Sequence, residues 1–253
     1  MPQAAGVGSD RALLQGGLLC LLAFLTLTVV VTQHRFDRAD QAARGFVQQT
    51  RHPAIFGFME GASYYGGQPG QVAVLVVGIV ALWSRQRRWA LALPVVMAGV
   101  GIVQFVAKWA VDRPRPNLAP WGFPSAHVLS LVVLCGFLAY VVCLDCARPA
   151  RGRAALVACA AVVGTVAYSR MYLEAHFLSD ILGGFTAGLA YLSFAIWGIR
   201  SAPPLGEIAS WWPLARGVEP LLVPISAGSV IEPLAEPVAA VSTAPVTSVG
   251  DAA

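Results

Sequence analysis

The sequence predicts an all-α membrane protein, a polytopic bundle of about six transmembrane helices. Hydrophobic residues make up 57% of the 253 residues and charged residues only 12%, whereas ordinary globular domains carry about 25% charged residues. The mean hydropathy is +0.67. A soluble protein of this size could not cover its surface with so few charges, and a disordered chain would contain far less apolar surface.

Six apolar segments are candidate membrane spans, and a spanning helix needs about 20 mostly apolar residues. They run over Ala12–Thr32, Pro69–Trp83, Trp89–Val111, His127–Asp145, Ala154–Ser169 and Ile181–Ile199. The first is expected to stay as an anchor, because it is long for a signal peptide and no small-residue cleavage site follows it. The second and fifth are the shortest.

Between the first two spans lies a polar segment, Gln33–Gln68, that contains one helical pattern. Its apolar residues recur at helical spacing with charges between them: Phe36, Ala39, Ala43, Phe46 and Val47. This suits a helix in the membrane interface, or equally an ordinary packed surface helix. The glycines that follow (Gly61, Gly66, Gly67 and Gly70) are expected to break regular structure before the second span.

The chain therefore divides into three predicted parts. Residues 1–45 form the anchor and the start of the interfacial segment, residues 46–200 form the core in the membrane, and residues 201–253 form a tail. The tail is rich in Pro, Ala, Val and Ser without a sustained period, which is typical of disorder.

The cations occur in short clusters between apolar runs, so the net charge of +4 does not indicate a nucleic-acid surface. Arg85, Arg87 and Arg88 fall in one loop, and Arg148, Arg151 and Arg153 in another on the same predicted side. Arginine-rich short loops favour the cytoplasm, which places both termini there and the loops 112–126 and 170–179 outside. The outward loops also hold arginines, which topology does not explain.

The five cysteines indicate neither a disulfide framework nor a metal site. Four lie inside apolar runs as small hydrophobes, and the one Cys-x-x-Cys pair, Cys143 and Cys146, has no second pair and no histidine beside it.

Lys108, the only lysine of the chain, lies near the end of an apolar span. A lysine at this depth is either functional, or its long side chain extends so that the ammonium group reaches the membrane interface. The stretch Asp112-Arg113-Pro114-Arg115-Pro116 follows, and its prolines predict an extended, stiff backbone. Such a loop can hold the guanidinium groups of its arginines in fixed positions for binding an anion.

Two further segments contain histidine. In Pro124-Ser125-Ala126-His127, Ser125 stands at the expected N-cap of the next span, and a helix N-terminus is a ready anion site. His176 and Asp180 are four residues apart, so on one helix they would share a face, with the carboxylate orienting the imidazole as nucleophile or base. A metal site is disfavoured, because the remaining histidines, His34 and His52, lie elsewhere and cations crowd this region.

The order Lys-x6-Arg-Pro, Pro-Ser-x-His and Ser-Arg-x5-His-x3-Asp resembles the type 2 phosphatidic acid phosphatase family, membrane lipid phosphatases that share a core with vanadium haloperoxidases. The resemblance covers about residues 46–200. It implies that His176 attacks phosphorus, that Asp180 orients His176, and that His127 protonates the leaving oxygen. Phosphate-binding groups would be Lys108, Arg115, Arg170, Ser125 and the Ala126 N–H.

Two positions depart from the family pattern. Ala126 stands where glycine is usual, which keeps the N–H but tightens the pocket. Glu174 stands where a small residue is usual, and its charge is expected to repel substrate or to raise the pKa of a histidine. Three cations would do the work of a magnesium ion, so no cofactor or metal is implied.

The resemblance implies a phosphatase for a lipid phosphate or diphosphate, with membrane lipids around it. Isoprenyl diphosphate, phosphatidic acid and phosphatidylglycerol phosphate all stay open as substrates. A soluble phosphate ester is the alternative within the enzyme class, and a catalytically silent transporter or scaffold is the alternative outside it. The Ala, Gly and Arg content suggests a bacterial inner membrane, with the site facing outward.

Overall fold

The computed structural model describes residues 6–145 and 149–203, and every regular element within them is an α-helix. The bounds are α1 Gly6–Thr32, α2 Asp37–Gln49, α3 Pro53–Tyr65, α4 Gln68–Trp83, α5 Arg87–Val111, α6 Ala126–Asp145, α7 Pro149–Tyr172 and α8 Leu178–Ser201. The predicted all-α bundle is confirmed. Most of the predicted tail, from residue 204 on, lies outside the described residues, as does Cys146.

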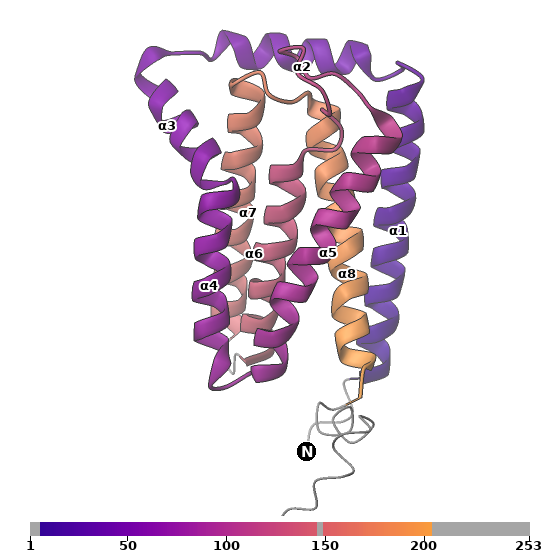
Figure 1. Cartoon of the computed structure of the whole chain (residues 1–253), viewed down its shortest axis with the longest axis vertical. Coiled ribbons are helices and arrows are strands. Elements are labelled where there is room, and N and C mark those ends of the chain that lie inside the picture. Colours follow the sequence, from indigo (N-terminus) through magenta and orange to yellow (C-terminus); the bar gives the residue numbers. More distant parts are fainter. Residues whose placement is uncertain (1–5, 146–148, 204–253) are drawn as a thin grey trace, which may run out of the picture. The chain divides into compact units, whose positions relative to one another are not determined.

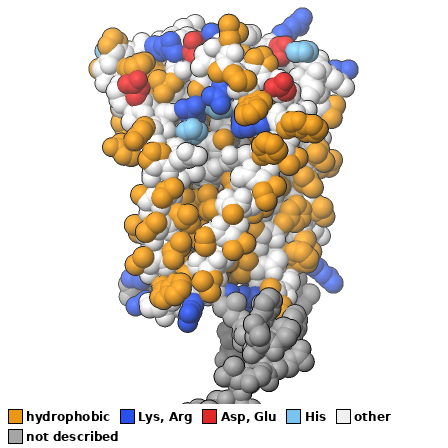
Figure 2. Space-filling model, viewed as in Figure 1, with side chains coloured by type: hydrophobic (Ala, Val, Ile, Leu, Met, Phe, Trp, Pro, Cys, Tyr) orange, Lys and Arg blue, Asp and Glu red, His pale blue; other side chains and the backbone are white. Residues whose placement is uncertain are grey.

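Five of these helices are long and apolar enough to cross a membrane: α1, α5, α6, α7 and α8. The pair α3 and α4 passes the same test as one span that is bent by 53°. In Figure 1 these helices run side by side, and α2 lies across one end of the bundle. Figure 2 shows hydrophobic side chains over the middle of the visible face and charged side chains at the two ends, as a bilayer requires.

Helix α6 forms the centre of the bundle. It packs against α7 on one side and α8 on another, and α1 packs against α8. One core cluster joins α5, α6 and α8 through residues such as Leu93, Leu129 and Phe137, and a second joins α6 to α7. Gly184 of α8 permits the close approach to α6, because a Cβ there would lie 2.8 Å from the Ser125 carbonyl oxygen.

The expectation that the glycines after the interfacial segment break regular structure holds at two of the four positions only. Helix α3 begins at Pro53, with the His52 side chain accepting the Ala54 N–H as an N-cap, and it runs through Gly61 without interruption. The break is confined to Gly66 and Gly67, between α3 and α4. At Gly66 a Cβ would lie 2.5 Å from the Val166 side chain, so the helix is broken where its backbone meets α7.

The predicted interfacial pattern does form a helix, α2, and one of its faces is packed against protein. Asp40 and Val47 are buried, and Val47 joins Met59 and Tyr172 in a small core cluster under α2. Phe46 points away and is exposed. The helix therefore covers the ends of α7 and α8, which it contacts.

Candidate active site

The three sequence motifs meet at the end of the bundle that α2 covers. Lys108 lies in the last turn of α5, His127 in the first turn of α6, Arg170 in the last turn of α7, and Asp180 in the first turn of α8. Their charges act on one another: His127 interacts with Arg170, His176, Arg115 and Lys108. The ends of four spans and the loops that join them thus bring the titratable groups of the motifs together in one site.

His176 and Asp180 are in contact, with 3.3 Å between Nδ1 and Oδ2. The expected single helix is absent, however, because α8 begins only at Leu178 and His176 stands before it. The Asp180 carboxylate also accepts the Phe177 N–H at 2.9 Å, which caps the helix. Asp180 therefore fixes the backbone beside His176 and the ring of His176 with the same oxygen.

His176 is buried, and burial lowers its pKa to about 4. The hydrogen bond and the charge of Asp180 oppose this shift, while Arg170 and Arg115 add to it. At neutral pH the imidazole is therefore uncharged. With Nδ1 directed at Asp180, the ring proton belongs on Nδ1, and Nε2 carries a free lone pair. This is the form that a nucleophilic histidine needs.

Lys108 and Arg170 are held by groups that were not anticipated. Lys108 Nζ donates to the carbonyl oxygens of Trp121 (2.7 Å) and Pro124 (3.0 Å), so it also fixes the loop that precedes Ser125. Arg170 Nη1 donates to the hydroxyl of Ser63 on α3. Both cations are thus anchored on one side.

Three of the predicted phosphate-binding residues carry buried polar atoms that lack a hydrogen-bond partner among the described residues: Arg115 Nε, Arg170 Nε and Ser125 Oγ. Ser125 immediately precedes α6 as predicted, but its hydroxyl does not cap the helix. Buried donors without partners are costly. The Ala126 N–H adds a fourth donor, since the first N–H groups of a helix have no partner within it.

The loop that contains Arg115 is closed by hydrogen bonds within its own backbone. Arg115 N–H donates to the Ala119 carbonyl (2.8 Å), and Gly122 N–H donates to the Arg113 carbonyl (2.6 Å), so the chain turns back on itself. The prolines stiffen this turn. It returns the chain to Ser125, whose N–H donates to the Asp180 carbonyl at 2.9 Å.

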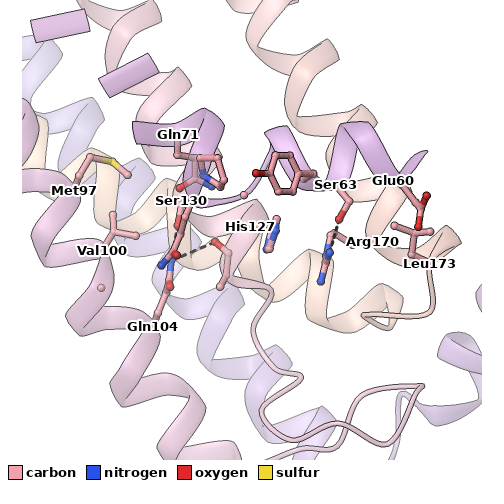
Figure 3. Close-up of a pocket in the computed structure, with 16 residues that line it drawn as sticks. Glu60, Ser63, Gln71, Met97, Val100, Gln104, His127, Ser130, Arg170 and Leu173 are labelled. Carbon is pink, nitrogen blue, oxygen red and sulfur yellow. Dashed lines mark hydrogen bonds between the residues drawn. The ribbon is translucent and has the colours of Figure 1, made fainter. Parts of the chain in front are cut away.

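A cavity of about 770 Å³ opens beside His127, Arg170 and Ala126. In Figure 3, Ser63 points at Arg170, and His127 lies between Arg170 and the Gln104–Ser130 pair. The break between α3 and α4 closes over His127, because a Cβ on Gly67 would lie only 2.9 Å from His127 Nε2. Along α5 the cavity reaches Gln104, Val100 and Met97.

The expectation that Glu174 raises the pKa of a histidine was wrong. Its Oε1 accepts hydrogen bonds from Arg44 Nη2 (3.0 Å) and Gln48 Nε2 (2.6 Å), both on α2. Through these hydrogen bonds Glu174 attaches α2 to the loop before His176. Glu174 is not among the groups that shift the pKa of His176, and that pKa is lowered, not raised. Glu174 is a structural anchor for α2.

Several site residues were missed by sequence reasoning. Ser63 and Gly67 lie in the segment that was expected to be irregular, and Gln104 looked like an ordinary polar residue within a span. Asp40 and Arg113 form a buried ion pair of 2.8 Å. The sequence showed Asp40 only as one of the charged residues between the apolar positions of the predicted interfacial helix. In the described part of the chain, no cluster of three or more His, Cys, Asp or Glu side chains could hold a metal ion.

Comparison with known proteins places this site in a family. Residues 89–202 match the model of the PAP2 superfamily, a range that contains all three motifs. Phosphatidylglycerophosphatase B of Bacillus subtilis (strain 168) is 26% identical over 176 residues, which cover 66% of this chain and 87% of that relative. The chain belongs to the PAP2 superfamily.

Two further comparisons agree with this PAP2 assignment. Lipid phosphate phosphatase delta of Arabidopsis thaliana is 24% identical over 58% of this chain and 39% of its own length. The crystal structure of a transmembrane PAP2 type phosphatidylglycerolphosphate phosphatase from Bacillus subtilis shares the fold, with a TM-score of 0.66 and 22% identity over 72% of this chain and 94% of that one. The protein is a PAP2 membrane phosphatase.

Proposed function

We propose that this PAP2 protein hydrolyses a lipid phosphate through a phosphohistidine intermediate. His176 Nε2 attacks phosphorus while the bond to the leaving oxygen breaks, and His127 gives its proton to that oxygen. Water then attacks the phosphohistidine while its proton passes to His127, the bond between phosphorus and Nε2 breaks, and phosphate leaves with both histidines in their starting forms. The observation that carries the proposal is a set of buried donors that have no hydrogen-bond partner within residues 6–145 and 149–203: Arg115 Nε, Arg170 Nε and Ser125 Oγ. They accompany a neutral, buried His176.

The cations and helix-end donors would stabilise the phosphoryl oxygens during transfer. In phosphoryl transfer most of the catalysis is positioning and charge stabilisation. Lys108, Arg115 and Arg170 supply three positive charges, and Ser125 Oγ and the Ala126 N–H supply hydrogen bonds. In this arrangement the charge that Mg²⁺ provides in other phosphotransfer enzymes comes from side chains.

The depth of the cavity favours a lipid over a soluble ester. Met97 and Val100 line it, and Met97 lies 11 residues before Lys108 on α5, which is about 16 Å along the helix. A cavity that extends this far along α5 and reaches the apolar side chains of Val100 and Met97 suits a hydrocarbon chain held in the bilayer. The similarity to phosphatidylglycerophosphatase B makes phosphatidylglycerol phosphate the first candidate, before phosphatidic acid and isoprenyl diphosphate.

The proposal is tested by phosphate release from purified protein in EDTA. We expect turnover of phosphatidylglycerol phosphate, phosphatidic acid and undecaprenyl diphosphate, with the first the fastest, and little turnover of glycerol 3-phosphate, which lacks the chain. Orthovanadate should inhibit, because it adopts the five-coordinate geometry of phosphoryl transfer at His176. Activity that EDTA removes and magnesium restores would contradict the cation site, and faster turnover of glycerol 3-phosphate would contradict the lipid pocket.

We also propose that the site faces the extracytoplasmic side of a bacterial inner membrane. The arginines at the α4–α5 turn and at the start of α7 (Arg85, Arg87, Arg88, Arg151 and Arg153) lie at the end of the bundle opposite the site (Figure 1). Short loops rich in arginine favour the cytoplasm. At the other end, Arg115 and Arg170 belong to the proposed phosphate site, and Arg44 and Arg113 bond to Glu174 and Asp40.

Single cysteines in a background without the five native ones would test this orientation. Ser84→Cys and Asn117→Cys both place the thiol at an exposed position, at opposite ends of the bundle. On intact cells we expect an impermeant thiol reagent to label the second and spare the first, with both labelled after lysis as the control. The reverse pattern would place the site in the cytoplasm.

A further inference from the structure

A buried carboxylate on α2 lies outside the PAP2 match and has three hydrogen bonds into the site. Asp40 is 1% exposed. It accepts the Ser179 N–H (2.8 Å) and the Ser179 hydroxyl (2.6 Å) through its two oxygens, and Arg113 Nη2 lies 2.8 Å from Oδ2. Ser179 directly precedes Asp180, so α2 is bonded to the segment that carries the catalytic carboxylate.

Arg113 continues this network to Asp180. Its Nη1 donates to Ser179 Oγ (2.6 Å) and to Asp180 Oδ1 (3.3 Å), and its guanidinium lies over the Phe177 ring, 4.7 Å from the ring centroid. The side chain is only 13% exposed. A planar fork with donors on two nitrogens can bridge two carboxylates in a fixed geometry, which an ammonium group cannot do.

The two oxygens of Asp180 therefore have separate partners. Oδ1 faces Arg113, whereas Oδ2 faces His176 Nδ1 and the Phe177 N–H. A rotation of the carboxylate would break contacts on both sides at once. The buried charges alternate in sign from Asp40 to Arg113 to Asp180, and such pairing is what makes ions tolerable in an apolar interior.

We propose that Asp40 and Arg113 are positioning residues that hold Asp180, and through it His176, in the orientation for attack on phosphorus. The inference rests on the proposed role of His176 as nucleophile. Neither residue touches substrate in this scheme. Asp40 fixes the guanidinium of Arg113 and the backbone at Ser179, and Arg113 fixes the free oxygen of Asp180.

The alternative is that Asp40 only docks α2, and the structure offers a way to separate the two roles. Helix α2 has a second attachment, in which Arg44 and Gln48 bond to Glu174, and a third in the Val47–Met59–Tyr172 cluster. These contacts hold the helix without reaching Asp180. Asp37, on the same helix, lies 3.5 Å from Arg113 Nη2 but is 45% exposed.

The test compares Asp40→Asn with two controls, Arg44→Gln and Asp37→Asn, by kcat, KM and Tm on phosphatidylglycerol phosphate in detergent. We expect Asp40→Asn to lower kcat about 100-fold with KM unchanged, because small misplacements of reacting groups cost about that factor. Arg44→Gln weakens α2 docking and should lower Tm with kcat retained. Asp37→Asn should match wild type.

A second variant covers the case in which Asp40→Asn does not fold. Arg113→Lys keeps the positive charge but cannot bridge Asp40 and Asp180 at the same time, so kcat should also fall about 100-fold at unchanged KM. Full kcat in Arg113→Lys or Asp40→Asn would overturn the proposal, and so would an equal loss of kcat in Arg44→Gln. Activity in His176→Ala would instead refute the proposed function, which makes the two failures distinguishable.

Discussion

Replacement of His176 by alanine is expected to abolish hydrolysis of every substrate. His176 is proposed to form the bond to phosphorus, and no leaving group can bypass a missing nucleophile. We expect kcat/KM to fall by at least about 10⁴-fold both on a lipid phosphate and on p-nitrophenyl phosphate. Phosphate release from purified wild type and variant, in the same detergent, measures the loss.

His34 provides a matched control for this substitution. It lies at the covered end of the bundle, in the turn before α2, with an exposed side chain whose described partner is Asp37, at 3.1 Å. His34→Ala should keep full activity. Substantial activity of His176→Ala on either substrate would exclude the covalent mechanism, because no phosphohistidine can form at position 176 without the imidazole.

Replacement of His127 by alanine is expected to have an effect that depends on the leaving group. General acid catalysis contributes about 10²–10⁴-fold, and the requirement falls as the leaving group becomes less basic. A lipid phosphate releases a strongly basic alkoxide, so His127→Ala should lose a factor in that range. The phenolate of p-nitrophenyl phosphate leaves without a proton, and the loss there should be much smaller.

The measurement is kcat/KM of His127→Ala on both substrates, each relative to wild type. The ratio of the two losses is informative because effects on folding or on phosphate binding enter both substrates equally. An equal loss on both would assign His127 to phosphate binding or to the fold, because it shares a cavity with Arg170 and lies against the Gly67 backbone.

The spans and the residues of the motifs were predictable because their signals are local. Apolar runs near 20 residues identify membrane helices by length and composition alone, and the structure extends several of them by only a few residues, as for α8, Leu178–Ser201. The His176–Asp180 contact was also predicted, although its helical premise was wrong. Two residues four apart do meet here, but not on one turn of helix. His176 lies before α8, and Asp180 reaches it from the N-terminal cap of that helix.

The supports of the site could not be predicted because their partners are distant in sequence. Asp40 and Arg113 are 73 residues apart, and Arg44 and Glu174 are 130 apart. No period or spacing joins such pairs, so Glu174 was interpreted from its neighbours alone. Helix α3 was missed for a different reason. Its glycines were given too much weight, although Gly57 and Gly61 face open space and a helix tolerates them at modest cost.

The bond between Asp40 and Ser179 spans 139 residues, and it sets an order of events during biosynthesis. At ribosomal speeds of about 5–20 residues per second, on the order of 10 s passes between the synthesis of the two residues. Helix α1 is likewise made long before its packing partner α8, the last span within the described residues. During this interval α2 can stay at the membrane surface, where water solvates the Asp40 carboxylate. The site is therefore completed only when α8 has been inserted, and partly made chains remain inactive toward the lipids that surround them.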